Sequence, residues 1–187
     1  MNQQQINHLI SLSKKRNRAA QKALYEFTYE KLMNVPLRYI NSLEDANWHF
    51  NLAMLNVYES LKNFSMKRDY IPWARVIIIR STINQLRQNN KFKSAVSVVD
   101  IDFLEDHSAS ELNNALNQLQ YNDILTMLRT LPEKQRIIFS LHEIDEMTHE
   151  EIENLTGIKL NTSKWLLAKA KKNMQNKLHN LKVYSCG

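Results

Sequence analysis

The side chains with the clearest chemistry in this sequence are lysines near the C-terminus, whose ammonium groups could bind the phosphates of a nucleic acid. They share one segment of helical periodicity, from about Asn161 to Leu178: Lys164, Lys169, Lys171, Lys172 and Lys177. Two helices joined by a glycine-containing turn, the second of them basic, form a motif that the major groove of DNA accepts. This segment therefore predicts the DNA-binding helix of a helix-turn-helix.

The elements that must position these lysines have recognisable ends. Pro132 suits the first turn of a helix, where its missing N–H leaves nothing unpaired. A second helix is expected to begin after Thr148, whose side chain can cap the N–H of Glu151 while the Glu151 carboxylate reaches back to the N–H of Thr148. Gly157 is expected to end that helix, because glycine readily adopts the left-handed conformation needed there. Asn161 is the residue expected to cap the third helix.

Charge is distributed unevenly along the chain, whose net charge is +6. Residues 62–93 contain eight Lys or Arg and one acid, residues 94–123 contain six acids and no Lys or Arg, and residues 159–187 contain seven lysines and no acid. Any one of these runs could be a solvated surface. The alternation is more typical of two polyanion-binding modules joined by a segment that DNA would repel.

Hydrophobic periodicity predicts an all-α fold, and two glycines and three prolines are too few for a β-rich protein. The helices expected in the N-terminal half are 19–40, with a kink at Pro36, then 43–64 and 73–88. The last of them has core candidates at helical intervals: Trp73, Val76, Ile77, Ile83 and Leu86.

The composition predicts two small helical domains joined by an acidic linker. We expect the first domain at residues 1–93, the linker at 94–121 and a second domain at 122–187 that contains the helix-turn-helix. In the second domain the apolar stripe at spacings of three and four is expected to form the core: Leu167, Ala170, Met174 and Leu178.

The sequence offers little for catalysis or metal binding. His142 and His149 lack the His-Glu-x-x-His spacing of a metal site, and two glycines leave no glycine-rich phosphate loop. The longest apolar run, 76–79, is too short for a bilayer, the N-terminus does not resemble a signal peptide, and the single cysteine, Cys186, excludes an internal disulfide. We expect a cytoplasmic protein with no enzyme activity, no cofactor, no metal and no membrane insertion.

Several segments resemble the extracytoplasmic-function (ECF) sigma factors of bacterial RNA polymerase, which belong to the sigma-70 family. Residues 20–25 resemble the first helix of that family's region 2, and residues 58–64 match its aromatic-x-x-Leu-x-x-Phe run. Residues 73–87 resemble the helix that the family uses on the −10 promoter element. Residues 131–136, with the helix-turn-helix after them, resemble region 4, which reads the −35 element.

The resemblance implies that the protein binds core RNA polymerase and promoter DNA and directs transcription initiation. Its implied −10 contacts, which would hold a flipped base and the separated strand, are Lys67, Arg68, Tyr70, Arg75, Arg80, Asn84, Gln85 and Arg87. Its implied −35 contacts are Asn161, Thr162, Lys164, Trp165, Lys169 and Lys172. Its implied contacts with core polymerase are Asp45, Asn51, Leu52 and Asn56.

Two departures from the family's pattern affect these surfaces. Asp45 is retained from an acidic stretch that precedes the polymerase-binding helix, but the later acids are missing. Trp165 and Leu166 stand where members often have a small residue and an arginine, and both cannot face the core. At least one is expected to be exposed or docked on a partner such as an anti-sigma protein, and −35 reading is expected to use apolar contact with thymine methyls.

Two other functions are compatible with the same residues. One is an autonomous helix-turn-helix regulator, which usually dimerises to read paired half-sites, although no heptad seam is visible here. The other is an interaction protein that keeps a sigma-like fold and sequesters partners, which the altered residues Asn47, Trp48, Leu52 and Leu166 would support. Transcription with core polymerase separates these alternatives.

Overall fold

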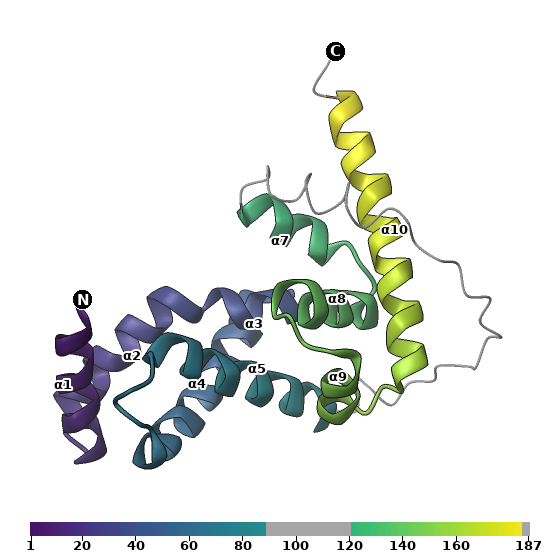
Figure 1. Ribbon diagram of the computed structural model, residues 1–187. Helices are drawn as coiled ribbons and strands as arrows, with labels where there is room; N and C mark the ends of the chain where they lie inside the picture. The colour runs from purple at the N-terminus through teal and green to yellow at the C-terminus, as the bar shows by residue number, and fades with distance from the viewer. Residues whose placement is uncertain (89–120, 185–187) are drawn as a thin grey trace. The chain divides into compact units, whose positions relative to one another are not determined.

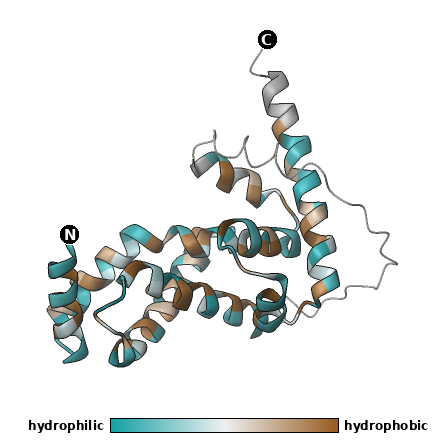
Figure 2. Ribbon diagram, in the orientation of Figure 1, coloured by the Kyte–Doolittle hydropathy of each residue, from teal (hydrophilic) through white to brown (hydrophobic). Residues whose placement is uncertain are grey.

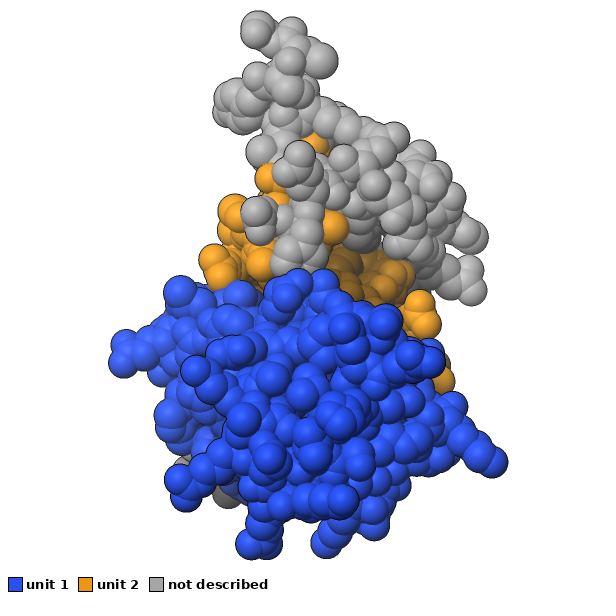
Figure 3. All heavy atoms as spheres, turned by 90° about the vertical axis from the view of Figure 1, so that its left-hand side faces the viewer, with its two compact units in different colours: residues 1–88 blue, residues 89–187 orange. Residues whose placement is uncertain are grey.

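The computed structural model describes residues 1–88 and 121–184, and the regular structure within these ranges is helical (Figure 1). The all-α fold predicted from the sequence is confirmed. The chain divides into two compact units, 1–88 and 89–187, which are coloured separately in Figure 3. Apart from Tyr121, the predicted acidic linker lies outside the described residues. No described helix combines the length and the hydrophobicity that a membrane span requires.

Unit 1 is a helical bundle in which α4 packs against α5, α1 packs on α2, and α3 contacts both α4 and α5. Its elements are α1 (Gln3–Lys14), α2 (Arg18–Leu32), α3 (Asn34–Tyr39), α4 (Leu43–Ser60), a 3-10 turn (Leu61–Asn63) and α5 (Tyr70–Gln88). The largest side chains buried at its centre are Ile10, Leu24, Tyr39, Phe50, Met54, Leu61, Tyr70, Ile78 and Ile83. Each helix also carries hydrophilic residues on its remaining surface (Figure 2).

Side-chain caps begin three of these helices. The Asn2 side chain accepts from the N–H of Gln5 at 2.9 Å, and the Gln5 side chain accepts from the N–H of Asn2, so a full capping box starts α1. Asn17 and Ser42 cap α2 and α4 in the simpler way, each accepting one backbone N–H. These polar residues satisfy N–H groups that a helix start would otherwise leave without a partner.

The helix expected over residues 19–40 is two helices. The chain leaves α2 after Leu32 and enters α3 at Asn34, so the break falls near Met33 and not at Pro36. The reason is that a proline ring clashes with the carbonyl four residues earlier, here Leu32, and provides no N–H to bond it. Pro36 is instead accommodated within the first turn of α3, where no N–H is needed.

Unit 2 contains the helix-turn-helix. Its elements are α7 (Tyr121–Arg129), α8 (Glu133–Phe139), a π-helical turn (Ser140–Ile144), α9 (His149–Thr156) and α10 (Leu160–Tyr184). The capping box at the start of α9 is confirmed, because Thr148 and Glu151 exchange both predicted hydrogen bonds. Gly157 ends α9 in the left-handed conformation, with φ at 77°. Short, locally determined turns therefore set the position of α10.

The start of α10 differs from the sequence-based expectation. Asn161 is an exposed residue within the first turn of α10 and not its cap, since the helix begins at Leu160. The N–H of Leu160 donates to the carboxylate of Glu153 in α9 at 3.1 Å, so α9 itself supplies an acceptor at the start of α10. A carboxylate is favourable there because the N-terminal end of a helix carries partial positive charge.

One side of α10 packs into the core of unit 2. The predicted stripe is confirmed as buried, and Leu166 joins it: Leu166, Leu167, Ala170, Met174 and Leu178. Leu167, Ala170, Met174 and Leu178 recur at spacings of three and four, and Leu166 lies four residues before Ala170, so the opposite side of the helix remains available to solvent.

We expect Gly157→Ala to destabilise unit 2 by about 1 kcal/mol, because a side chain at positive φ strains the backbone. Apart from the glycine itself and its two chain neighbours, no heavy atom lies within 4 Å of where the new Cβ would stand, so the cost comes from the local backbone and not from a packed neighbour. Urea unfolding followed by circular dichroism measures it. Gly157→Asn is the matched control and should lose less, since asparagine tolerates this conformation; equal stability of the alanine variant and the wild type would contradict the assignment.

Candidate nucleic-acid interface

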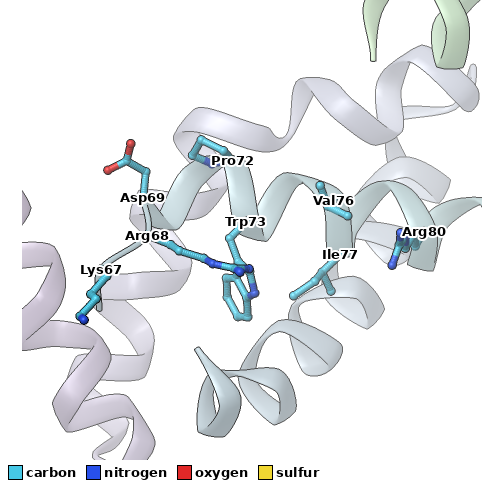
Figure 4. A pocket seen from close by; sticks show the side chains of 8 residues that line it. All are labelled: Lys67, Arg68, Asp69, Pro72, Trp73, Val76, Ile77 and Arg80. Atoms are coloured by element: carbon cyan, nitrogen blue, oxygen red, sulfur yellow. The ribbon is translucent and has the colours of Figure 1, made fainter. Parts of the chain in front are cut away.

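A pocket of about 620 Å³ opens on the surface of unit 1 between the loop at 65–69 and the first half of α5 (Figure 4). Its apolar wall comes from α5, and its charged groups come from the loop and from the next turn of the helix. The lining residues are Lys67, Arg68, Asp69, Pro72, Trp73, Val76, Ile77 and Arg80. An apolar surface can pack against an unstacked base, and the cations that border it can bind the phosphates attached to that base.

Two other aromatic rings pack against the Trp73 indole. The centroid of Phe64 lies 4.6 Å from that of Trp73, and the centroid of Tyr70 lies 5.9 Å away. Phe64 is itself held at its backbone, because the Lys14 ammonium of α1 donates to its carbonyl at 3.0 Å. Trp73 is half-buried, so part of its ring remains available on the pocket side.

Tyr70 supports this arrangement from the core and does not lie on the surface. Tyr70 is the first residue of α5, and its side chain is 1% exposed. Thr28 of α2 donates its hydroxyl to the Leu24 carbonyl at 2.6 Å, so the Tyr70 hydroxyl is the donor in its 2.8 Å hydrogen bond with Thr28. Burial raises the pKa of Tyr70 above its usual value. Tyr70, one of the −10 contacts that the resemblance implies, therefore presents no ring surface to a base in this structure.

The remaining predicted −10 residues divide between two faces of α5. Arg80, Asn84 and Arg87 are exposed and follow the pocket residues at spacings of three and four, so they extend the same face. Arg75 and Gln85 are half-buried and lie off that face. The Gln85 amide donates to the Ser81 hydroxyl at 2.9 Å, which ties it to the inside of the bundle.

Part of this face was not predicted from the sequence. Val76 was expected in the core but is 46% exposed, and Trp73 and Ile77 are only half-buried. All three line the pocket. The signal that could have revealed them is their register with Arg80, since residues three, four and seven apart share one side of a helix.

The residues predicted to bind core polymerase lie along α4. Asp45 is exposed in the first turn, Leu52 is half-buried, and Asn51 is exposed while its side chain accepts from the Tyr25 hydroxyl at 2.6 Å. Asn56 is directed toward α5, where its amide donates to the Ser81 hydroxyl at 2.9 Å.

Two apolar side chains that the polymerase prediction omitted stand on the same side of α4. Trp48 is 53% exposed and Leu55 is 57% exposed, and helical spacing places both beside Leu52. Between Leu43 and Ser60 the helix contains no Lys or Arg. This face of α4 is therefore apolar with acidic ends.

In unit 2 the predicted −35 residues cluster on the solvent side of α10. Asn161, Lys164, Lys169 and Lys172 are exposed, and Thr162 and Trp165 are half-buried. The Lys169 ammonium lies 4.9 Å from the centre of the Trp165 ring, which is the geometry of a cation–π contact.

The expectation for Trp165 and Leu166 is confirmed in one part and corrected in another. Trp165 remains partly exposed, whereas Leu166 is 5% exposed and packs in the core. Leu166 cannot reach a DNA base, because its side chain fills the interior between α10 and the helices behind it. Of the two, only Trp165 can provide apolar contact on this surface.

Two comparisons with known proteins show what the chain is similar to. Residues 121–174, which include the helix-turn-helix, match the family model described as Sigma-70, region 4. Over 188 aligned positions the chain is 21% identical to the RNA polymerase sigma-H factor of Pseudomonas aeruginosa, and the alignment covers 97% of each chain. The helix-turn-helix of unit 2 is thus similar to region 4 of the sigma-70 proteins.

Proposed function

We propose that the protein acts in the cytoplasm as an ECF-type sigma factor that binds core RNA polymerase, holds the opened −10 element with unit 1 and reads the −35 element with unit 2. It acts by binding and carries no enzyme activity of its own. The observation that supports this best is the pocket of unit 1, which places cations around an exposed part of Trp73. An autonomous regulator of duplex DNA would have no use for it.

In unit 1 the proposed ligand is the single strand of the −10 element. Opening a duplex costs a few kcal/mol per unstacked base, which a protein can offset by enclosing the base and binding its phosphates. Trp73 and Ile77 provide an apolar surface for a base, and Arg68 at the rim provides a cation. The strand would continue along the exposed face of α5 past Arg80, Asn84 and Arg87. Lys67 belongs to the same rim.

In unit 2 the proposed ligand is the duplex of the −35 element. The first turns of α10 would enter the major groove, as the second helix of a helix-turn-helix does. Lys164 and Lys172 would bind phosphates, and Trp165 would contact thymine methyl groups, which are the apolar features of the major-groove surface. The cation of Lys169 stays beside the indole and adds positive charge to this face.

The proposed contact with core polymerase is the face of α4 that contains Trp48, Leu52 and Leu55, with Asp45 at its start and Asn51 beside it. Large apolar side chains exposed together are uncommon on a protein that functions alone, and they favour a protein partner. Asn56 is left out because its amide is already bonded to Ser81.

Run-off transcription with core RNA polymerase tests the function. We expect the chain to produce transcripts from a subset of genomic promoter fragments on which core enzyme alone is silent. Leu55→Asp should strongly reduce the yield, because it places a charge in the apolar face of α4. Leu43→Asp is the matched control, since Leu43 is 59% exposed on the other side of the same helix. Duplex binding without any transcript would support the autonomous regulator instead.

We expect Arg80→Ala to reduce promoter opening by about tenfold, because losing a hydrogen bond to a phosphate costs about 1.5 kcal/mol. Permanganate reactivity of thymines in the −10 element measures opening, and gel shift measures duplex binding in parallel. Lys22→Ala removes the same charge from an exposed site on α2 and should leave opening unchanged. An equal loss of opening and duplex binding in the Arg80 variant would contradict the placement of the strand along α5.

Lys164→Ala should weaken binding to a −35 duplex and lower the slope of log affinity against log salt by about one, as expected for one lost phosphate contact. The duplex is one selected by the wild-type chain from a randomised pool. Lys177→Ala makes the same change far along α10, away from the proposed groove contact, and should keep the slope. If the Lys164 variant kept the wild-type slope, the start of α10 would not lie in the groove.

A further inference from the structure

Two histidines meet at the centre of the helix-turn-helix. His142 lies in the π-helical turn that follows α8, and His149 is the first residue of α9. Their ring centroids are 4.6 Å apart and the rings are inclined by 31°. Both side chains are half-buried. The seven-residue separation hides this contact in the sequence, because a turn lies between them.

Each imidazole is connected to the recognition helix α10 by a separate route. The Nδ1 atom of His149 lies 2.8 Å from the hydroxyl of Ser163, which is fully buried in α10. The Nδ1 atom of His142 lies 2.8 Å from Glu143 Oε1, and the same oxygen lies 3.1 Å from the ammonium of Lys171 in α10. The pair therefore joins the π-helical turn, α9 and two separate positions of α10.

The described residues contain no group of three histidine, cysteine or acidic side chains that could hold an ion. The positive and negative groups around His149 are unequal in number. His142 and Glu143 face it from the π-helical turn, and Lys164 and Lys171 face it from α10. The single carboxylate, that of Glu143, is accompanied by three groups that are cationic or can accept a proton: His142, Lys164 and Lys171.

A proton on His149 is therefore unfavourable in the folded protein. Burial lowers the pKa of His149 below its usual value, and His142 and Lys164 lower it further, while Glu143 acts in the opposite direction. The neutral form is compatible with the ring contact and with the hydrogen bond to Ser163. The charged form would place like charges side by side in a partly desolvated site.

We propose that the His142–His149 pair positions the recognition helix α10 in a proton-dependent way, so that −35 binding weakens as the solution becomes acidic. The inference rests on the proposed role of α10 in reading the −35 element. His149 acts as a positioning residue through Ser163 and does not itself contact DNA. A sigma factor with this device would lower promoter selection in an acidified cell.

The direction of the effect follows from the proton balance. Because the folded state disfavours the proton, the unfolded state binds more protons between the lowered pKa of His149 and the ordinary histidine value of about 6.5. The contribution to the stability of unit 2 is complete above that ordinary value. It is lost as the pH falls through the lowered pKa of the folded state.

The test compares the full-length wild type with His149→Asn at about pH 7.5 and about pH 5.5, a range in which histidine is the side chain that ordinarily titrates. Asparagine keeps a polar group near the position of Nδ1 but does not titrate. The first measurement is amide hydrogen exchange across α9 and α10, corrected for the intrinsic effect of pH. The second is the preference for a selected duplex over a scrambled one. His8→Asn, an exposed histidine of α1, is the matched control.

In the wild type and the His8 variant we expect acidification to speed exchange in α9 and α10 by at least about threefold, and to reduce duplex preference similarly, since one pKa unit corresponds to tenfold. The His149 variant should show neither change. His142→Asn, which removes the neighbouring imidazole, should reduce both responses and serves if the His149 variant fails to fold. A pH response retained in both variants, or absent from the wild type, would overturn the proposal.

The two measurements also separate this inference from the proposed function. If the wild type preferred no duplex at either pH, −35 reading by α10 would be wrong, while the exchange data would still test the coupling of His149 to α10. If exchange responded to pH through His149 but duplex preference did not, the coupling would exist without controlling recognition, and the proposal would be overturned.

Discussion

Tyr70 is buried between α2 and the start of α5, and its hydroxyl donates to Thr28 inside the bundle. The position of the pocket in unit 1 depends on this contact. It fixes where α5 begins, and Phe64 and Trp73 pack against the Tyr70 ring from the adjoining turns. A buried hydroxyl without a partner would cost about 1–3 kcal/mol, so the pairing with Thr28 strongly favours one placement of the ring. The loop at 65–69 then spans two fixed ends, and its cations border the pocket that they form with α5.

In unit 2 local contacts determine the position of α10. The capping box at Thr148, the left-handed Gly157 and the carboxylate of Glu153 at the start of α10 all act within a short stretch of chain. Such contacts involve residues three to seven apart, and they leave few alternative directions for α10. The core face of α10 completes the constraint, because burying Leu166 and Leu167 turns Trp165 outward.

This difference explains what could be predicted from the sequence. Signals that act within one or two turns, such as the Thr148 box, Gly157 and the stripe from Leu167 to Leu178, were correct. Tyr70 was misjudged because its partner, Thr28, lies 42 residues away and nothing in the loop reveals it. Val76 was placed in the core because it is apolar and recurs at helical intervals, although the packing of α5 on α2, α3 and α4 decides which of its faces is covered.

Two neutral amides on α4, Asn47 and Asn51, form hydrogen bonds within the fold. Asn47 and Asn51 follow Asp45 in the stretch where the family resemblance implies further acids, and their side chains accept from the hydroxyls of Tyr29 and Tyr25 at 2.8 and 2.6 Å. These amides bond to α2 without charge. Trp48 and Leu55 remain exposed beside them. Under the proposed function, the contact with polymerase would gain more from apolar burial than from ion pairs. Apolar burial is far less sensitive to salt than attraction between exposed charges, which ions screen over about 8–10 Å, so polymerase binding would tolerate salt that weakens the lysine-dependent contact of α10 with DNA.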